Sequence, residues 1–299
     1  MDLDCIVIGG GVAGQSAALA LGRARRRTLL ADEGRPSNLA AHGVGGLIGH
    51  DGRPPADLYE RGRAEIAAYP AVEHRATTAV DAVPDGDGFA VTLDDGTRAS
   101  AATVLLATGM EYRYPEVPGA AERWGGSVFH CPFCHGWEVR ERPLAVLDPG
   151  QTGVHRALLL RAWSDEVTLL TNGAPPVDAD RLLAAGVRIE ERPVAALRGP
   201  GTELETVVLE DGDELPCQGV LVATTMHQRT DLAARLGAQL KPPGPLFADA
   251  VDARPDGATS VPGLFVAGDA AGIMPSVPNA LASGAMVGAA LVRDLMGAA

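Results

Sequence analysis

The first 32 residues alternate between apolar runs and a glycine-rich turn, in an order that predicts a strand, a helix and a second strand. The segment "CIVIGGGVAGQSAALALGRARRRTLLAD" begins with an apolar run, turns, and then repeats small and apolar residues at helical spacing. Its last apolar run ends at Asp32. This order of elements is typical of α/β folds with a parallel sheet.

The turn has the G-x-G-x-x-G spacing of a dinucleotide-binding loop, with Gly9, Gly11 and Gly14 at the three glycine positions. The first glycine allows a tight turn, the second lets the backbone approach a pyrophosphate, and the third lets the helix pack closely on the strand. The N-terminus of the helix offers unpaired N–H groups to phosphates. Asp32 is placed to bind a ribose hydroxyl. We therefore predict a dinucleotide site rather than a turn without a ligand.

The same pattern returns in "LAVLDPGQTGVHRALLLRAWSDEVTLLTN", where Gly150 and Gly153 match Gly11 and Gly14 at an offset of 139 residues. The segments "TVLLATGM" and "GVLVATTM" form a second matching pair, and each predicts the strand that closes one module. Such self-similarity indicates an internal duplication. The sequence therefore predicts two modules of the dinucleotide-binding type.

A third signature, "SVPGLFVAGDAAG", predicts a short strand that ends at Gly268 and Asp269, and the residues after it have helical periodicity. Proline and glycine mark changes of module near Tyr114 and near residues 242–245. We predict an α/β fold with two Rossmann-like dinucleotide-binding domains, the second inserted in the first. The first domain is predicted to contain residues 1–114 and 243–299, and the inserted domain residues 115–242.

The two modules differ where a nucleotide would bind. Asp148 replaces Gly9, Thr171 replaces Asp32, and Thr225 replaces Gly109. A carboxylate followed by Pro149 opposes a pyrophosphate, both by its charge and by the loss of an N–H group. The segment "TNGAPP" after the second strand contains no arginine for a 2′-phosphate. We predict that the second module keeps its fold and has lost its nucleotide; binding through the backbone alone is the alternative.

Composition narrows the class of protein. The chain is 46% hydrophobic and 21% charged, as soluble globular proteins are, and its formal net charge of -13 argues against a nucleic-acid partner. No apolar run reaches the ~18 residues of a membrane span. The start "MDLDCIVIGG" carries acids where a signal peptide carries basic residues, so we expect a cytoplasmic protein. In that compartment a close cysteine pair is typically redox-active or metal-binding.

The segment "HCPFCHGWE" contains such a pair, Cys131 and Cys134. The spacing suits a reversible disulfide, half of a zinc site or a structural staple. A structural zinc takes four ligands, and the remaining Cys5 and Cys217 lie in or beside predicted strands without a second Cys-x-x-Cys, so we expect no metal. Pro132 suits the first position of a helix, where the helix N-terminus stabilises a Cys131 thiolate. We therefore favour a redox pair.

Four motifs in order make the chain similar to the low-molecular-weight thioredoxin reductase family of flavoproteins: "GGGVAG", "ATG" at residues 107–109, the cysteine pair and "GLFVAGDAAG". The resemblance covers almost the whole chain and implies FAD in the first module, NADPH in the second, and a homodimer. It also implies that Cys131 exchanges with substrate while Cys134 lies against the flavin. The implied FAD-binding residues are Gly9, Gly11, Gly14, Asp32, Asn38, His42, Thr108, Gly109, Gly268, Asp269, Asn279 and Ala280.

The motif "CPFCHGWE" is more similar still to a branch of this family that includes the dithiol oxidases of gliotoxin, holomycin and romidepsin biosynthesis. Those enzymes oxidise a small-molecule dithiol to a disulfide and pass the electrons through FAD to O2, giving H2O2. The resemblance predicts an FAD-dependent dithiol oxidase, whose partners are a small-molecule dithiol and O2. The alternatives are a thioredoxin-disulfide reductase driven by NADPH or by a donor such as ferredoxin, and a flavin-bearing redox sensor without turnover.

His135 stands where reductases of this family typically have an aspartate. Disulfide exchange moves protons, and an imidazole does this near neutral pH, so we predict a catalytic base; packing beside Trp137 is the alternative. His42 is either a second base near the flavin or a loop residue. Trp124, Phe133 and Trp137 either line a pocket for a flat dithiol or pack in a core.

Overall fold

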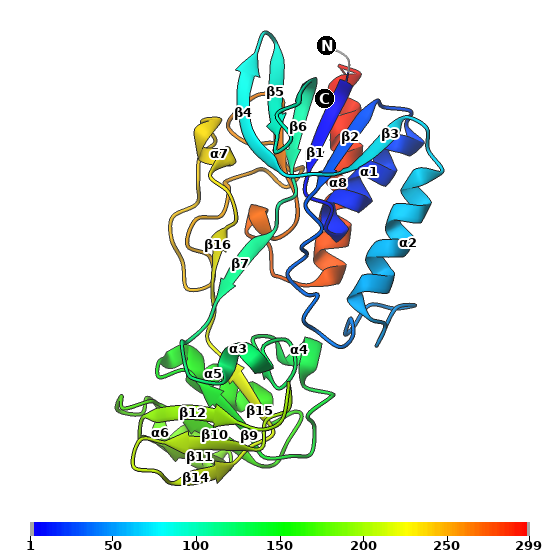
Figure 1. Ribbon diagram of the computed structural model, residues 1–299. Coiled ribbons are helices and arrows are strands. Elements are labelled where there is room, and N and C mark those ends of the chain that lie inside the picture. The colour runs from blue at the N-terminus through cyan, green and yellow to red at the C-terminus, as the bar shows by residue number, and fades with distance from the viewer. Residues whose placement is uncertain (1–2, 298–299) are drawn as a thin grey trace. The chain divides into compact units, whose positions relative to one another are not determined.

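A computed structural model describes residues 3–297, which fold into two compact units (Figure 1). The first unit contains residues 3–37, 55–112 and 225–297, and the second contains residues 38–54 and 113–224. These limits differ from the predicted domains in three places. Residues 225–242 lie in the first unit, and residues 113–114 and the loop 38–54 lie in the second. The predicted α/β class, with a parallel sheet in each of two modules, is confirmed.

The first unit is built on a seven-stranded sheet of order β3-β2-β1-β6-β5-β4, in which β17 also pairs with β6. The strands β3, β2, β1, β6 and β17 pair in parallel. Strand β5 pairs antiparallel with β6, and β4 pairs antiparallel with β5. The strands are β1 (Leu3–Ile8), β2 (Thr28–Asp32), β3 (Val72–Ala76), β4 (Ala79–Asp85), β5 (Gly88–Leu93), β6 (Arg98–Leu106) and β17 (Leu264–Val266).

Side chains of β1 alternate between two buried clusters, as a strand covered on both faces requires. Cys5 and Val7 pack in the cluster that contains α1 and α8, while Ile6 and Ile8 pack in the cluster on the other face. The helices are α1 (Val12–Arg23), α2 (Pro55–Ala67), α7 (Leu232–Arg235) and α8 (Val277–Leu295), with a 3-10 turn η1 (Gly268–Ala271). None of the helices within residues 3–297 is long and apolar enough to cross a membrane.

The second unit has a parallel sheet of order β11-β10-β9-β15-β8, and a separate antiparallel sheet of order β12-β13-β14. The parallel strands are β8 (Val128–Phe129), β9 (Leu144–Leu147), β10 (Val167–Leu170), β11 (Val187–Glu190) and β15 (Gly219–Val222). The antiparallel strands are β12 (Val194–Arg198), β13 (Thr206–Leu209) and β14 (Glu214–Pro216). The helices are α3 (Ala120–Arg123), α4 (Pro132–His135), α5 (Gln151–Leu160) and α6 (Ala179–Ala184).

The chain leaves the first unit through β7 (Met110–Arg113) and returns to it through β16 (Thr225–Gln228). These two strands pair with each other as a two-stranded sheet. This pairing, together with the packing of α7 beside β4, places residues 225–242 in the first unit. The predicted boundary at residue 242 followed the proline-rich segment, which lies further along the chain than the strand that returns to this unit.

Candidate active site

The glycine turn of the first unit has the geometry of a phosphate-binding loop. Gly9 has φ +105°, and a Cβ atom on it would lie 2.3 Å from the carbonyl oxygen of Ala107. A Cβ on Gly14 would lie 1.9 Å from the carbonyl oxygen of Gly9, so this glycine allows α1 to pack on the turn. A Cβ on Gly11 would meet nothing within 4 Å. The protein itself therefore requires Gly9 and Gly14, whereas only a ligand would require Gly11.

Asp32 ends β2 beside this loop and is buried. Its carboxylate accepts hydrogen bonds from the backbone N–H groups of Gly10 at 3.2 Å and Gly34 at 2.8 Å. The Nε2 atom of His74 lies 3.5 Å from the second carboxylate oxygen. A Cβ on Gly10 would lie 2.1 Å from the Asp32 Cγ atom, so that position must also be glycine. Backbone donors thus fix the Asp32 carboxylate at the place predicted for a ribose contact.

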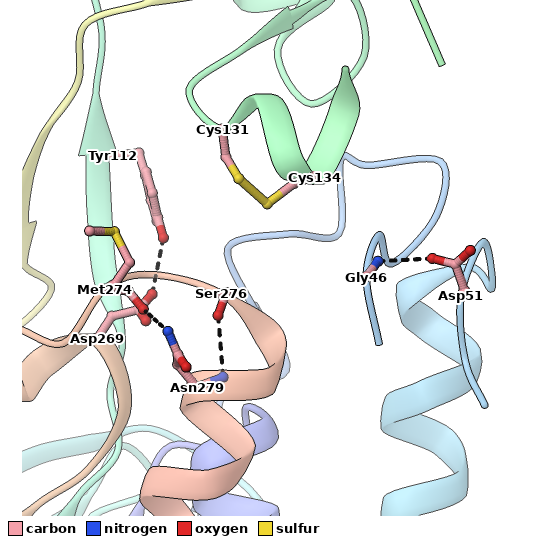
Figure 2. Close-up of a disulfide and its surroundings, with 9 residues drawn as sticks. All are labelled: Gly46, Asp51, Tyr112, Cys131, Cys134, Asp269, Met274, Ser276 and Asn279. Carbon is pink, nitrogen blue, oxygen red and sulfur yellow. Dashed lines mark hydrogen bonds between the residues drawn. A yellow bond between two sulfur atoms is a disulfide. The ribbon is translucent and has the colours of Figure 1, made fainter. Parts of the chain in front are cut away.

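A cavity of about 480 Å³ runs along the carboxyl ends of these strands. It is lined by eight of the predicted cofactor residues: Gly9, Gly11, Asp32, Thr108, Gly109, Gly268, Asp269 and Ala280. Gly14 supports the loop from behind it. Asn279 lies at the start of α8, where its backbone N–H donates to Ser276 and its side-chain amide donates to the carbonyl of Met274 (Figure 2). Asn38 and His42 fall in the second unit.

Asp269 is a second carboxyl group that lines this cavity, and it is partly buried. Tyr112 on β7 donates a hydrogen bond from its hydroxyl to Asp269 Oδ2 at 3.0 Å (Figure 2). Burial raises the pKa of Asp269 to about 6, although the Tyr112 hydrogen bond and the charge of Arg229 oppose the shift. Burial, together with the nearby Asp269 charge, also raises the pKa of Tyr112, which therefore remains a donor. Tyr112 was not predicted from the sequence, in which its only signal is its place in the strand after "ATG".

The second unit carries the cysteine pair as a disulfide, with the two Cα atoms 5.3 Å apart (Figure 2). Cys131 is the N-cap residue of α4, and Pro132 is its first helical residue, as predicted. The helix is only one turn long, so a Cys131 thiolate would be stabilised by local N–H groups rather than by a long helix dipole. The other two cysteines, Cys5 and Cys217, are buried free thiols, and burial raises the pKa of each to about 12.

His135 ends the same helical turn, and its ring stacks on Phe129 with centroids 5.7 Å apart. Both ring nitrogens are buried, and neither has a hydrogen-bond partner among residues 3–297. Burial lowers the pKa of His135 below its ordinary value, against the charge of Glu138, which raises it. The imidazole is therefore neutral at pH 7, and a ring nitrogen is free to accept a proton.

His42 belongs to the loop 38–54, and its Nε2 atom lies 3.2 Å from the Thr202 hydroxyl. The loop passes close to α4, because a Cβ on Gly45 would lie 2.6 Å from the carbonyl oxygen of Cys134. A hydrogen bond from the Gly46 N–H to Asp51 at 2.8 Å closes the loop on itself (Figure 2). His42 is exposed and bonded to Thr202; both roles considered for it, second base and loop residue, stay open.

The three aromatic residues near the cysteine pair divide into two groups. Trp124 stacks between Tyr114 and His130, with centroids 4.3 Å and 5.8 Å away, and packs against a buried cluster. Phe133 and Trp137 are 71% and 65% exposed. Phe133 meets the edge of Trp163, and the guanidinium carbon of Arg140 lies 3.7 Å from the centre of the Trp137 ring. The exposed pair can contact a ligand, whereas Trp124 is a packing residue.

The glycine loop of the second unit keeps one feature of the first and loses another. A Cβ on Gly153 would lie 2.0 Å from the carbonyl oxygen of Asp148, which matches the contact of Gly14 with Gly9. Asp148, however, is a buried carboxylate. It accepts hydrogen bonds from the Gly150 N–H at 3.2 Å and from the Thr152 hydroxyl at 2.8 Å, and it forms an ion pair with Arg156.

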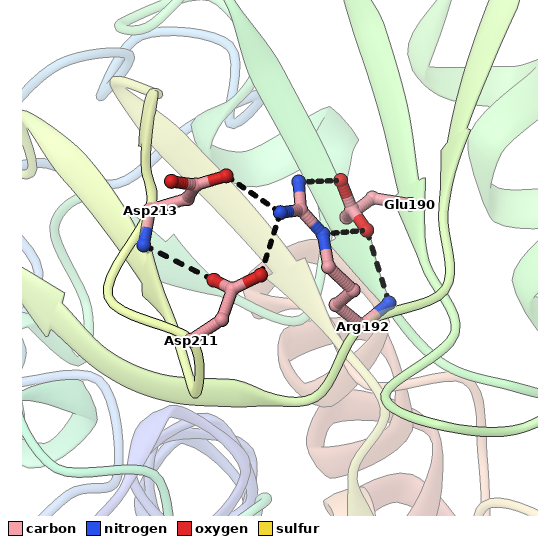
Figure 3. Close-up of polar contacts among 4 residues, drawn as sticks. All are labelled: Glu190, Arg192, Asp211 and Asp213. Carbon is pink, nitrogen blue, oxygen red and sulfur yellow. Dashed lines mark hydrogen bonds and ion pairs between the residues drawn. The ribbon is translucent and has the colours of Figure 1, made fainter.

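Two polar residues near this edge of the sheet are bound within the protein. Thr171 is buried and donates its hydroxyl to the carbonyl of Ala174 at 2.5 Å. Arg192, two residues beyond β11, is bound by three carboxylates (Figure 3). These are Glu190 at 2.8 Å, Asp211 at 2.8 Å and Asp213 at 2.7 Å. The charge of Arg192 is thus neutralised within the protein.

Comparisons with known proteins agree with this geometry. Residues 3–284 match the model of a family described as pyridine nucleotide-disulphide oxidoreductase. The chain is 32% identical to "Thioredoxin reductase tcpT" of Claviceps purpurea over 99% of this chain and 96% of that protein. It is also 32% identical to "Thioredoxin reductase sirT" of Leptosphaeria maculans, over 99% and 95%.

Solved structures show the same likeness. An oxidoreductase from Agrobacterium tumefaciens superposes with a TM-score of 0.93 at 36% identity, over 99% of both chains. The crystal structure of HlmI superposes with a TM-score of 0.91 at 35% identity, over 99% of this chain and 93% of that one.

Proposed function

Since this chain belongs to the pyridine nucleotide-disulphide oxidoreductase family, we propose that it is an FAD-dependent dithiol oxidase that forms a disulfide in a small-molecule dithiol. Family membership confirms the prediction of a flavin-dependent thiol/disulfide oxidoreductase. The direction of electron flow, the dithiol and the acceptor O2 are the proposal. Its main support is the contrast between an open nucleotide loop in the first unit and a loop filled by the Asp148 carboxylate in the second.

The first unit fits FAD. The open side of Gly11 and the N-terminus of α1 would hold the pyrophosphate, and Asp32 would bind the ribose. Asp269 and the N-terminal end of α8 complete the donor and acceptor set. When bound, FAD would supply oxidation of the cysteine pair and transfer of the electron pair to O2, giving H2O2.

The residues of the second unit would carry out thiol–disulfide exchange. A neutral His135 takes the proton of one substrate thiol, and the thiolate attacks Cys131 Sγ, which breaks the Cys131–Cys134 bond and releases Cys134 as a thiolate. The second substrate thiol then attacks the substrate sulfur of the mixed disulfide and gives its proton to the departing Cys131. The product disulfide forms, and Cys131 leaves as a thiol. One dithiol is thus oxidised while one protein disulfide is reduced.

The second candidate is a thioredoxin-disulfide reductase driven by NADPH, which the names of the two fungal relatives favour. The second unit opposes it. The carboxylate of Asp148 accepts a hydrogen bond from the Gly150 N–H in the loop where a pyrophosphate would bind, and Arg192, two residues beyond β11, is held by three acids. Exposed Phe133 and Trp137 next to the disulfide suit a small aromatic or heterocyclic substrate.

The deciding experiment is anaerobic bleaching of the flavin in the purified holoenzyme. A small dithiol should bleach the flavin within seconds, and air should restore the yellow colour with one H2O2 formed per dithiol consumed. Stoichiometric NADPH should leave the colour unchanged over the same time. Rapid bleaching by NADPH would refute the oxidase proposal and favour the reductase. Bleaching by neither would favour a flavoprotein without thiol turnover.

His135 gives a second test of the same chemistry. His135→Ala should retain FAD and the disulfide but slow bleaching by a dithiol by at least ~10²-fold near pH 7, because a general base is lost. Raising the pH toward 9 should recover part of the rate, since the dithiol then ionises unaided. Burial lowers the pKa of His135 in the wild type. The rate of bleaching should therefore fall only at a pH below the one at which an ordinary histidine becomes protonated. His155→Ala, at an exposed position, is the matched control.

A further inference from the structure

We propose that His42 is the proton exit of the disulfide site: it takes the proton that thiol–disulfide exchange leaves on His135 and passes it to water. The inference deepens the proposed function and rests on it, because it follows the proton that His135 receives from the substrate thiol. That proton must leave before His135 can accept the next one. Both ring nitrogens of His135 are buried and without a hydrogen-bond partner among residues 3–297, so release needs an acceptor that is in contact with water.

The loop that carries His42 passes the disulfide at two points. Its Ala40 lies against Gly125, because a Cβ on Gly125 would lie 2.9 Å from the Ala40 carbonyl carbon. Its Gly45 lies against Cys134, because a Cβ on Gly45 would lie 2.6 Å from the Cys134 carbonyl oxygen. His42 belongs to the stretch of loop between these two contacts. The loop thus brings an imidazole to the helical turn that contains the disulfide.

The titratable groups around His135 favour His42 as the acceptor. Burial lowers the pKa of His135, Glu138 raises it, and a charge on His42 lowers it further. His135 also acts on His130, but burial lowers the pKa of His130 to about 4, so His130 takes up no proton near pH 7. Carboxylates in water take up protons about two pH units below imidazoles. Near neutral pH, His42 is therefore better suited than Glu138 or His130 to receive the proton.

The contacts of His42 suit a group that gains and loses a proton. Its Nε2 atom lies 3.2 Å from the Thr202 hydroxyl, which can donate or accept, so the contact persists in both protonation states. The Ser127 hydroxyl donates to the Thr202 carbonyl at 2.7 Å and holds that residue in place. His42 is exposed, so its Nδ1 atom can exchange with water. The proton moves from the N–H of the His135 imidazolium to the unprotonated Nδ1 of His42, over a hydrogen bond or one bridging water, and then to solvent.

The first test follows the ring N–H protons of His135 in the holoenzyme by NMR, with the signals assigned by their loss in His135→Ala. His42→Gln keeps a hydrogen-bonding group beside Thr202 but carries no proton near neutral pH. It should slow exchange of the His135 protons with water by at least ~10-fold, and added imidazole should restore most of the rate. His50→Ala, in the same loop, is the matched control and should leave the rate unchanged, because its Nδ1 atom is buried.

The second test compares the first turnover with the steady state. In His42→Gln, anaerobic bleaching by the first equivalent of a dithiol should match the wild type, because His135 is already neutral. Aerobic oxidation of the dithiol in weak buffer should be at least ~10-fold slower than in the wild type and should recover when imidazole is added. Slow first bleaching would make His42 the base itself and would overturn its role as an exit.

The proposal is also overturned if His42→Gln leaves the exchange of the His135 protons unchanged. Slow exchange that imidazole does not restore would make His42 a structural residue, and equal slowing by Glu138→Gln would make the carboxylate the exit. The NMR readings need no dithiol. If dithiols fail to bleach the wild type, the proposed function fails, while the exchange of the His135 protons still decides whether His42 is their exit.

Discussion

The two Rossmann-like modules of this chain have the same backbone geometry at their glycine loops and differ in which residues fill those loops. In both, the third glycine packs against the turn, with an added Cβ only 1.9 Å or 2.0 Å from a carbonyl oxygen. In the first, the turn residue is Gly9 at φ +105°, whereas the second has Asp148, whose carboxylate accepts a hydrogen bond from the N–H of Gly150, the N-cap residue of α5. The comparison separates glycines that the fold requires from those that only a ligand requires.

The largest expected effect tests that separation at the second glycine of each loop. Gly11→Val should abolish the yellow colour and weaken FAD binding by on the order of 100-fold or more, because the added side chain blocks the pyrophosphate. Gly150→Val should leave the colour intact. An added Cβ meets nothing within 4 Å at Gly11 and only ordinary contacts at 3.8 Å and 3.9 Å at Gly150, so both variants should fold. Visible absorbance and far-UV circular dichroism measure the two properties.

A yellow Gly11→Val protein would show that the cofactor does not use this loop. Loss of colour in Gly150→Val would show instead that the second module supports FAD binding. Either result would remove the distinction between an open loop and a filled one.

The modules should also differ in their response to acid. Burial, followed by the charges of His135 and Arg156, lowers the pKa of His130 from 6.5 to about 4, while burial raises that of Asp269 in the first unit. Below pH 6.5 His130 becomes protonated in the unfolded chain but stays neutral in the folded protein. The stability that the neutral ring contributes is therefore complete above pH 6.5 and is lost as the pH falls toward about 4.

His130→Phe keeps a ring to stack on Trp124 and cannot titrate. Between pH 7 and pH 4, the wild type should lose about 3 kcal/mol more unfolding free energy than this variant. Urea denaturation at a series of pH values measures the difference. His155→Gln, at an exposed histidine, should behave as the wild type does. Parallel pH profiles for the wild type and His130→Phe would contradict the assignment.

The same substitution at the third glycine of each loop should destabilise both modules. Gly14→Ala and Gly153→Ala should each lower the free energy of unfolding by about 1–3 kcal/mol, because the new methyl group overlaps a carbonyl oxygen and the helix must shift. Gly150→Ala is the control, since its Cβ has room. If Gly153→Ala left the free energy of unfolding unchanged, α5 would not depend on the close packing that α1 requires.

Most of the fold was predictable because it depends on local periodicity. The strand–turn–helix order places β1, α1 and β2, and the repeat at an offset of 139 residues places β9, α5 and β10. The tail motif likewise predicts β17 and α8. Each element buries side chains at its own period, so a short window of sequence suffices.

The contacts that decide the candidate site are long-range and were not predictable. Tyr112 donates a hydrogen bond to Asp269, which lies 157 residues further along the chain, and no local sequence pattern predicts this bond. The loop 38–54, which contains the predicted cofactor residues Asn38 and His42, lies in the unit of the cysteine pair because its backbone packs on α4, and no local pattern predicts this contact. Asp148 was predicted to repel a phosphate, yet its pairing with Arg156 one helix turn away from Thr152 appears only in the structure.

The smallest expected effect concerns Arg192, whose charge is neutralised by three acidic partners in the second unit. The guanidinium side chain is 41% exposed, so its ion pairs are partly screened by solvent and salt. Hydrogen bonds from Arg192 hold the pKa of Glu190 below its usual range. Arg192→Gln should therefore lower the thermal midpoint by only ~1–2 °C in low salt, and the difference should shrink at about 0.5 M salt.

Arg198→Gln, which breaks one exposed pair with Glu214, is the matched control and should have a smaller effect. Because Arg192 already serves the protein's own carboxylates, its loss should not change the response of the flavin to NADPH. A large, salt-independent loss of stability would make Arg192 a structural residue of β11, and a changed response to NADPH would mean that its charge is available to a nucleotide after all.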